Sequence, residues 1–135
     1  MRSMTQTRVR FAETDAAGIV HYAQYLGYLE AGRAEALRSA GLTSANVATC
    51  TLSARLVDAV IRYRATARFD DLLEVHAWVT EVADPQFRFG YEIQRASDQG
   101  LIATAETLHT WAEPNPGTSR QLPPWLLIAL DRLSS

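Results

Sequence analysis

Residues 14–41 read TDAAGIVHYAQYLGYLEAGRAEALRSAG and hold the one long helical pattern that we find in this sequence. Apolar residues recur there near helical spacing, at Tyr22, Leu26, Leu29 and Ala36. Gly41 follows, and glycine is the residue type that most often ends a helix. We therefore expect a helix from about Val20 to about Ala40, of about eighteen residues and roughly 27 Å in length.

The residues before this helix predict a strand and then a capping site. Residues Thr5 to Phe11 alternate weakly and are rich in Thr, Val and Arg, which favours a first strand. Thr14 or Asp15 can cap the helix, and Gly18 loosens the backbone that follows.

Four more strands are expected after the helix, because the apolar pattern changes to a period of two from Leu52 onward. The alternation is clearest at Phe87, Phe89, Tyr91 and Ile93. Turn-forming residues divide the strands, which we place at Ala54–Arg68, Leu72–Val82, Phe87–Gln94 and Leu101–Ala112. The short connections imply antiparallel neighbours.

The end of the chain completes a single expected domain, residues 1–135, of the α+β class. Pro114–Gly117 closes the last strand, and Pro123 and Pro124 open a short C-terminal helix. The strand at Leu101–Ala112 would leave an exposed edge for a second subunit to cover. We therefore expect a homodimer and, beyond it, a homotetramer.

Composition excludes several classes of function. Thirteen basic against fifteen acidic residues leave a formal charge of -2, so no basic field is available for nucleic acid or an anionic membrane. The single Cys50 cannot form an internal disulfide, and no apolar run approaches the ~20 residues of a membrane helix. Motifs of serine hydrolases, P-loop proteins and zinc proteases are missing as well. We expect a cytoplasmic protein without a metal or an organic cofactor.

The densest group of candidates for chemistry is Thr14–Tyr22. Asp15 would stand beside the free N–H groups at the helix start, which can bind an oxyanion. It can attack a carbonyl directly or act as a general base on water, and it can equally be a helix cap alone. His21 can polarise a carbonyl or orient water, or simply pack among aromatic rings. His76 and His109 lie in strand patterns and are interpreted as structural.

Three stretches of this sequence resemble the 4-hydroxybenzoyl-CoA thioesterase group of hotdog-fold enzymes. The first is Phe11–Arg33, FAETDAAGIVHYAQYLGYLEAGR, and the others are Val60–Val75, VIRYRATARFDDLLEV, and Ala103–Leu122. Together they span nearly the whole chain. The resemblance implies an antiparallel sheet wrapped around a long central helix, and hydrolysis of an acyl-CoA thioester to a free acid and coenzyme A.

The resemblance also implies roles for individual residues. The family motif Asp-x-x-Gly-[Ile/Val]-Val matches Asp15 and Gly18, which makes Asp15 the nucleophile or general base. The backbone N–H near Tyr22 would polarise the thioester carbonyl. Because family members place the active site between two subunits, Tyr25 and Leu29 are plausible walls of the acyl pocket.

Two departures from the family pattern leave the substrate open. Gln24 stands where many relatives have Asn, beside the expected acyl pocket. A basic cluster that helps hold the phosphates of coenzyme A is missing at Val82–Gln86, and Arg88, Arg95 or Arg120 are candidates to replace it.

Other functions stay open beside acyl-CoA hydrolysis. The missing basic cluster makes an acyl-carrier-protein thioester an alternative substrate. A module that binds thioesters without catalysis is an alternative function, because fold does not dictate activity. Dehydration of a hydroxyacyl thioester, another hotdog activity, is less favoured because no His paired with an acid is evident near Asp15.

Overall fold

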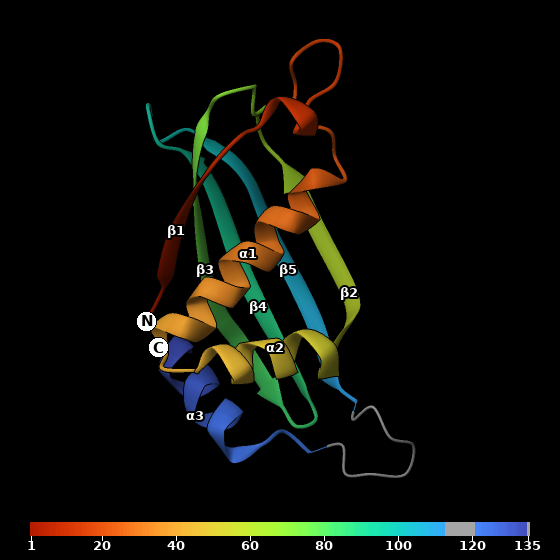
Figure 1. Ribbon diagram of the computed structural model, residues 1–135, viewed down its shortest axis with the longest axis vertical. Helices are drawn as coiled ribbons and strands as arrows, with labels where there is room; N and C mark the ends of the chain where they lie inside the picture. The colour runs from red at the N-terminus through yellow and green to blue at the C-terminus, as the bar shows by residue number, and fades with distance from the viewer. Residues whose placement is uncertain (113–120, 135) are drawn as a thin grey trace.

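The computed structural model describes residues 1–112 and 121–134, which build a five-stranded antiparallel sheet with a helix across one face (Figure 1). The sheet order is β1-β3-β4-β5-β2. Its strands are β1 (Ser3–Arg8), β2 (Ala54–Tyr63), β3 (Leu72–Ala83), β4 (Gln86–Arg95) and β5 (Leu101–Trp111). The helices are α1 (Gln24–Ser39), α2 (Ser44–Ser53) and α3 (Pro124–Leu133), and the 3-10 turn η1 covers Phe11–Glu13. The expected α+β class and hotdog architecture are confirmed.

The core lies between α1 and the sheet, because the strand positions that face the helix are apolar. On β4 these positions are at most 1% exposed, at Phe87, Phe89, Tyr91 and Ile93. Helix α1 packs chiefly over β1 and β3. The helix approaches the sheet closely at Gly32, where an added Cβ would lie only 2.6 Å from Cγ1 of Val75. Because Gly32 has no side chain, α1 can pack directly against β3 at this position.

Helix α1 begins later than the sequence pattern predicted, at Gln24 instead of about Val20. The preceding residues form bridges that a local pattern does not reveal, between Thr14 and Val20 and between Ile19 and Arg68. The end of the helix is as predicted, because Gly41 has a positive φ of 104° and follows the last turn.

The strand at Leu101–Ala112 was predicted to be an exposed edge, and this prediction is wrong. Strand β5 lies inside the sheet, between β4 and β2, and the free edges are β1 and β2. Tyr63 of β2 pairs with Ala103 of β5, which is far away in the sequence. Local sequence patterns therefore cannot predict this strand order. The edge strand β2 is exposed along most of its length.

Other boundaries differ by a few residues, and one helix was missed. Strand β1 ends at Arg8, and β2 ends at Tyr63 instead of continuing to Arg68. Helix α2 occupies residues that were assigned to no element. The C-terminal helix is confirmed, with Pro124 in its first turn, whereas the predicted turn Pro114–Gly117 lies outside the described residues.

The two ends of the chain meet at one side of the molecule, where the amino group of Met1 donates to the carbonyl of Arg132 at 3.1 Å (Figure 1). Within the described ranges, no helix is long and apolar enough to cross a membrane.

Candidate active site

Asp15 lies in a short hairpin and not at the cap of α1. Its Oδ1 accepts hydrogen bonds from the backbone N–H groups of Ala17 (2.9 Å) and Ile19 (3.2 Å). Gly18 supplies the positive φ of 76° that this turn requires. The hairpin thus fixes one carboxylate oxygen, while Oδ2 has no protein partner among residues 1–112 and 121–134.

A turn at His21–Ala23 leads from the hairpin into α1. The Nδ1 atom of His21 accepts the backbone N–H of Ala23 at 3.3 Å, which places the proton of a neutral ring on Nε2. The backbone N–H of Tyr22 has no acceptor in the part of the chain that the structure describes. It lies two residues before the first residue of α1, near the positive end of the helix dipole.

A hollow of about 430 Å³, which we name the loop cavity, lies beside the hairpin. It is lined by Asp15, Ile19, Val20, His21, Tyr22, Tyr25, Tyr63, Arg64, Ala65 and Thr66. The ring of Tyr63 lies 5.0 Å from that of Tyr25 and 5.2 Å from that of Tyr22. Burial raises the pKa of Tyr25 and of Tyr63, so both hydroxyls stay neutral around pH 7. The cavity therefore joins the predicted carboxylate to an aromatic wall.

Glu13 holds the hairpin against α1, a role that no sequence pattern revealed. Its carboxylate accepts the Tyr28 hydroxyl at 2.9 Å and the backbone N–H of Arg10 at 2.9 Å, and its carbonyl accepts the N–H of His21. Burial alone would raise the pKa of Glu13, but the hydrogen bonds that its carboxylate accepts from Arg10 and Tyr28, together with the charge of Arg10, lower the pKa below the ordinary 4.5. An ionised Glu13 therefore positions the turn that carries Tyr22.

Arg95 fixes the other wall of the loop cavity. Its Nε donates to Asp71 at 3.2 Å, its Nη1 pairs with Asp98 at 3.1 Å, and its Nη2 donates to the carbonyl of Thr66 at 2.7 Å. These contacts give Arg95 a structural role, which leaves it few donors for a phosphate.

The remaining predicted site residues lie elsewhere. Gln24 is half-buried and outside the wall of the loop cavity, and Leu29 lines a second cavity. Arg88 lies on the face of β4 that points away from α1, and Arg120 lies outside the described residues. Arg64, which the sequence analysis did not single out, does line the loop cavity.

The second hollow, which we name the helix cavity, lies between α1, α2 and the sheet and has a volume of about 510 Å³. Apolar side chains make up much of its wall, among them Leu26, Leu29, Leu37, Val47 and Phe87. Charged groups come from Glu30, Arg33 and Arg55. Sequence reasoning missed this cavity because it missed α2.

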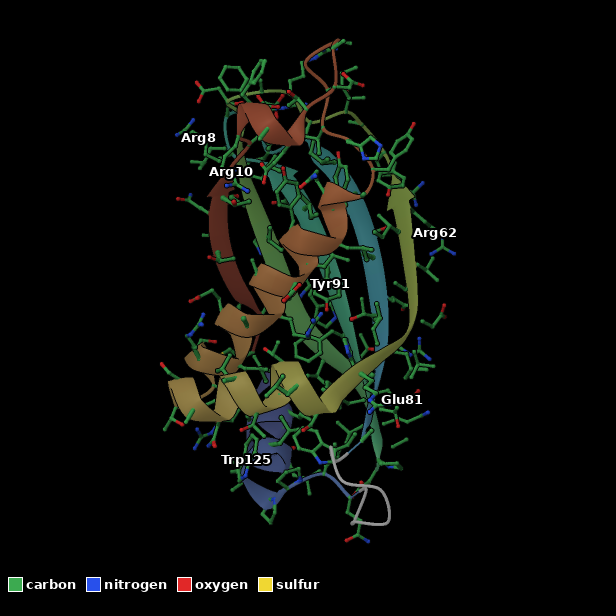
Figure 2. The ribbon with its side chains drawn as sticks, turned by 45° about the vertical axis from the view of Figure 1, so that its right-hand side comes forward. Arg8, Arg10, Arg62, Glu81, Tyr91 and Trp125 are labelled. Carbon is green, nitrogen blue, oxygen red and sulfur yellow. The ribbon has the colours of Figure 1, made fainter. Side chains whose placement is uncertain are left out.

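Four polar side chains form a hydrogen-bonded row beside the helix cavity. Nη1 of Arg33 donates to the Tyr91 hydroxyl at 3.0 Å, which contacts Oγ1 of Thr107 at 2.7 Å, and Thr107 contacts Nε2 of His109 at 2.8 Å. Figure 2 shows Tyr91 between α1 and the sheet. Burial, helped by the charge of Arg33, lowers the pKa of His109 to about 3, so Arg33 is the only cation in this row at neutral pH.

The described residues contain no group of three His, Cys, Asp or Glu side chains that could hold a metal ion. Burial raises the pKa of Cys50 to about 11, so its thiol stays protonated and is a poor nucleophile. Among the described residues, the loop cavity brings the carboxylate of Asp15 together with His21, Tyr22 and Tyr25.

Comparison with known proteins points to one family. Residues 9–130 match the family model described as the thioesterase-like superfamily. A 1,4-dihydroxy-2-naphthoyl-CoA hydrolase of Synechococcus elongatus is 30% identical, over 93% of this chain and 96% of that protein. The acyl-CoA thioester hydrolase YbgC of Escherichia coli is 29% identical, over 86% of each chain. Among solved structures, a 1,4-dihydroxy-2-naphthoyl-CoA thioesterase from Synechocystis aligns with a TM-score of 0.85 at 27% identity, over 100% of this chain and 99% of that one.

Proposed function

Because this chain belongs to the thioesterase-like superfamily, we propose that it hydrolyses an acyl-CoA thioester to a free acid and coenzyme A. Its relatives include proteins named as hydrolases of acyl-CoA and of 1,4-dihydroxy-2-naphthoyl-CoA. The observation that carries the proposal is Asp15, which lines an open cavity with one oxygen held by backbone N–H groups and the other without a partner among the residues that the structure describes.

Asp15 supplies the nucleophile or the general base. In one route its free oxygen attacks the thioester carbon, the C–S bond breaks, and water then cleaves the mixed anhydride. In the other route Asp15 takes a proton from water, the resulting hydroxide attacks the same carbon, and the thiolate leaves. Both routes consume one water and release an acid and a thiol, and both place negative charge on the carbonyl oxygen.

The backbone N–H of Tyr22 stabilises that charge. It has no acceptor among the residues that the structure describes, and Tyr22 lines the same cavity as Asp15. The hydrogen bond from a donor that is already in place near a helix N-terminus becomes stronger as negative charge develops on the carbonyl oxygen. His21 has its Nδ1 engaged, so its Nε2–H is the group left to orient water or the substrate.

Asp15→Asn separates chemistry from loop structure. The amide oxygen of Asn can still accept the N–H groups of Ala17 and Ile19, whereas it can neither attack nor take a proton. We expect kcat to fall by about 10²–10⁴-fold, the usual contribution of such a group. The native fold should be retained with little change in melting temperature, because Asp15, unlike Glu13, is exposed to water. The measurement is thiol release from benzoyl-, phenylacetyl-, short-chain and long-chain acyl-CoAs.

The matched control for this experiment is Asp131→Asn, an exposed carboxylate on α3 that should leave turnover as it is. Normal turnover by Asp15→Asn would remove Asp15 from the mechanism and leave it as a loop cap. If every coenzyme A ester survives the wild-type protein, acyl-carrier-protein thioesters are tested next. Tight binding without turnover of either class would favour the non-catalytic binding module.

We propose that the active unit is a homodimer formed through the edge strand β2. The loop cavity lies at the Tyr63 end of β2 and the helix cavity at its Ala54–Leu56 end. From Leu56 to Tyr63 the strand runs about 23 Å at about 3.3 Å per residue. Antiparallel pairing of two β2 strands about a twofold axis would bring the loop cavity of one protomer to the helix cavity of its partner.

Exposed apolar residues on and beside β2 support this interface. They are Leu56, Val57, Val60 and Tyr63 on the strand and Tyr22 and Leu26 near the start of α1. Edge strands that are this apolar usually pair with another chain. Arg64, which lines the loop cavity, is our candidate for binding a phosphate of coenzyme A. We also propose that the reaction takes place in the cytoplasm.

A further inference from the structure

Arg33 is a half-buried cation that no acidic side chain neutralises in the described part of the chain. Its one hydrogen bond there runs from Nη1 to the neutral hydroxyl of Tyr91. Glu30, one turn earlier on α1, also lines the helix cavity but makes no ion pair with it within residues 1–112 and 121–134. Charges that are partly removed from water usually have a counter-charge, so the site is incomplete as it stands.

The guanidinium has donors to spare. An arginine carries five N–H donors in a planar fork, and only one of them is engaged by Tyr91. The neighbouring groups in the row, Tyr91, Thr107 and His109, are bonded to one another and are neutral around pH 7. They hold Arg33 in place without compensating its charge. Arg33 thus has free N–H donors but no anionic partner among the described residues, and an anionic oxygen is the acceptor that a guanidinium binds most strongly.

The walls of the cavity restrict what can bring that oxygen. Leu29, Leu37, Val47 and Phe87 are buried apolar residues, and they leave a volume of about 510 Å³. A ligand that fills this space therefore needs a hydrocarbon body with a polar group at one position. That description fits an acyl group with a distal oxygen better than a plain alkyl chain or a small inorganic anion.

We propose that the helix cavity takes the acyl group and that Arg33 selects acyl groups whose far end carries a carboxylate or a phenolic oxygen. The inference rests on the proposed thioesterase function and on the pairing of two protomers through β2. Arg33 is a specificity-determining residue in this arrangement and takes no part in breaking the C–S bond. The positive balance of the wall, two arginines against Glu30, favours the same class of acyl group.

Matched substrate pairs test the proposal. Glutaryl-CoA is compared with 5-methylhexanoyl-CoA, and 4-hydroxybenzoyl-CoA with 4-methylbenzoyl-CoA, so that the size of the acyl group is kept and its distal oxygen is removed. We expect the oxygen-bearing member of at least one pair to have the higher kcat/KM, by about 10- to 100-fold, which is the range of a charge-assisted hydrogen bond. Which pair shows the preference distinguishes a carboxylate from a phenol.

Arg33→Met should abolish that preference while leaving hydrolysis of the apolar member nearly unchanged, because methionine keeps much of the length without the charge. Arg33→Lys should retain part of the preference. Arg38→Met is the matched control, since Arg38 is on the same helix but outside the cavity wall. A preference that survives in Arg33→Met, or one that is missing from the wild-type protein, overturns the proposal.

Binding gives a readout that does not depend on turnover. Calorimetric titration of Asp15→Asn with the same thioester pairs, and of the wild type with the free acids, should show the same preference and its loss in Arg33→Met. If hydrolysis is missing but the preference in binding is present, the proposed function fails and the role of Arg33 stands. If hydrolysis is present without any preference for the oxygen-bearing substrate, the proposed function stands and the role of Arg33 fails.

Discussion

Glu13 shows how one buried carboxylate positions the turn that leads into α1. It binds the Tyr28 hydroxyl on α1 through its side chain and the His21 N–H through its carbonyl. Glu13→Gln keeps the shape but weakens bonds to a charged acceptor, so we expect a loss of about 1–3 kcal/mol in the free energy of unfolding. Urea denaturation measures this loss, and Glu35→Gln should cost much less free energy of unfolding, because the side chain of Glu35 is 46% exposed.

The same residue predicts a dependence on pH. Because the pKa of Glu13 is below 4.5 in the folded protein, the unfolded chain binds a proton first as the pH falls through 4.5. The stability that Glu13 contributes is therefore present above this pH and is lost below it. The difference between the wild type and Glu13→Gln should shrink in denaturation at pH 3.5, and a constant difference would contradict an ionised Glu13.

His109 predicts a second loss of stability at acid pH, which begins at a higher pH than the loss caused by Glu13. Its folded pKa of about 3 lies below the ordinary 6.5, so from pH 6.5 downward the unfolded chain takes up a proton that the folded chain does not. One such group lowers the unfolding free energy by up to about 1.4 kcal/mol per pH unit. His109→Gln, which can still bond to Thr107, should flatten this slope between pH 6 and 4, and an unchanged slope would refute the assignment.

Helix α1 offers two glycines with opposite expected responses to alanine. At Gly32 an added Cβ would lie 2.6 Å from Val75, so Gly32→Ala should push the helix from the sheet and cost about 1–3 kcal/mol of stability. At Gly27 the same Cβ meets nothing within 4 Å, so Gly27→Ala should stabilise by up to about 1 kcal/mol. Thermal denaturation of the pair compares them. Equal effects would mean that the close approach of α1 to β3 carries no energy.

Elements with a strong local period were predictable, and elements set by long-range contacts were not. The alternation at Phe87 to Ile93 and the stop at Gly41 gave the strand and the helix end correctly. The start of α1 was placed too early, because bridges from the hairpin to Arg68 replace the first helical turn. Helix α2 was missed although Thr43, whose side chain accepts the N–H of Asn46, is a recognisable cap.

In the candidate site, too, residues in a local motif were predicted, whereas residues brought together by long-range contacts were not. Asp15, His21, Tyr22 and Tyr25 were predicted together and do share one cavity. Leu29 was predicted with them but lies in the helix cavity, since the two hollows are separated along β2. Glu13 and Arg33 were not found, because a single charged residue has no pattern and its burial depends on the tertiary fold.

The whole molecule is expected to assemble through β2. Val60→Lys places a charge on the outward face of this edge strand, which should block strand pairing and yield a monomer with little turnover. Met4→Lys is the matched control on the other edge strand, β1, and should leave the dimer intact. Sedimentation or light scattering gives the mass. A dimer that persists in Val60→Lys would place the interface elsewhere.

A mixed dimer tests whether the two cavities act across the interface. Suppose that each site takes Asp15 from one chain and Arg33 from the other. A dimer of one Asp15→Asn protomer and one Arg33→Met protomer then contains one site with both residues intact and one site with both residues changed. Co-purified mixed dimers should then recover about half of the wild-type turnover of an oxygen-bearing thioester, since one of two equivalent sites is whole. Sites built within single chains would give no recovery.

The separation of the two cavities along β2 has a consequence for how such a protein can diverge. Substitutions around α2 alter the helix cavity without touching the hairpin of Asp15, which is held by its own contacts to Glu13 and to residues 67–69. On the proposed assignment of the two cavities, substitutions at one end of β2 would change the preference for the acyl group, while the residues proposed for hydrolysis at the other end would stay the same. Evolution could then change the substrate in single steps that each leave hydrolysis intact.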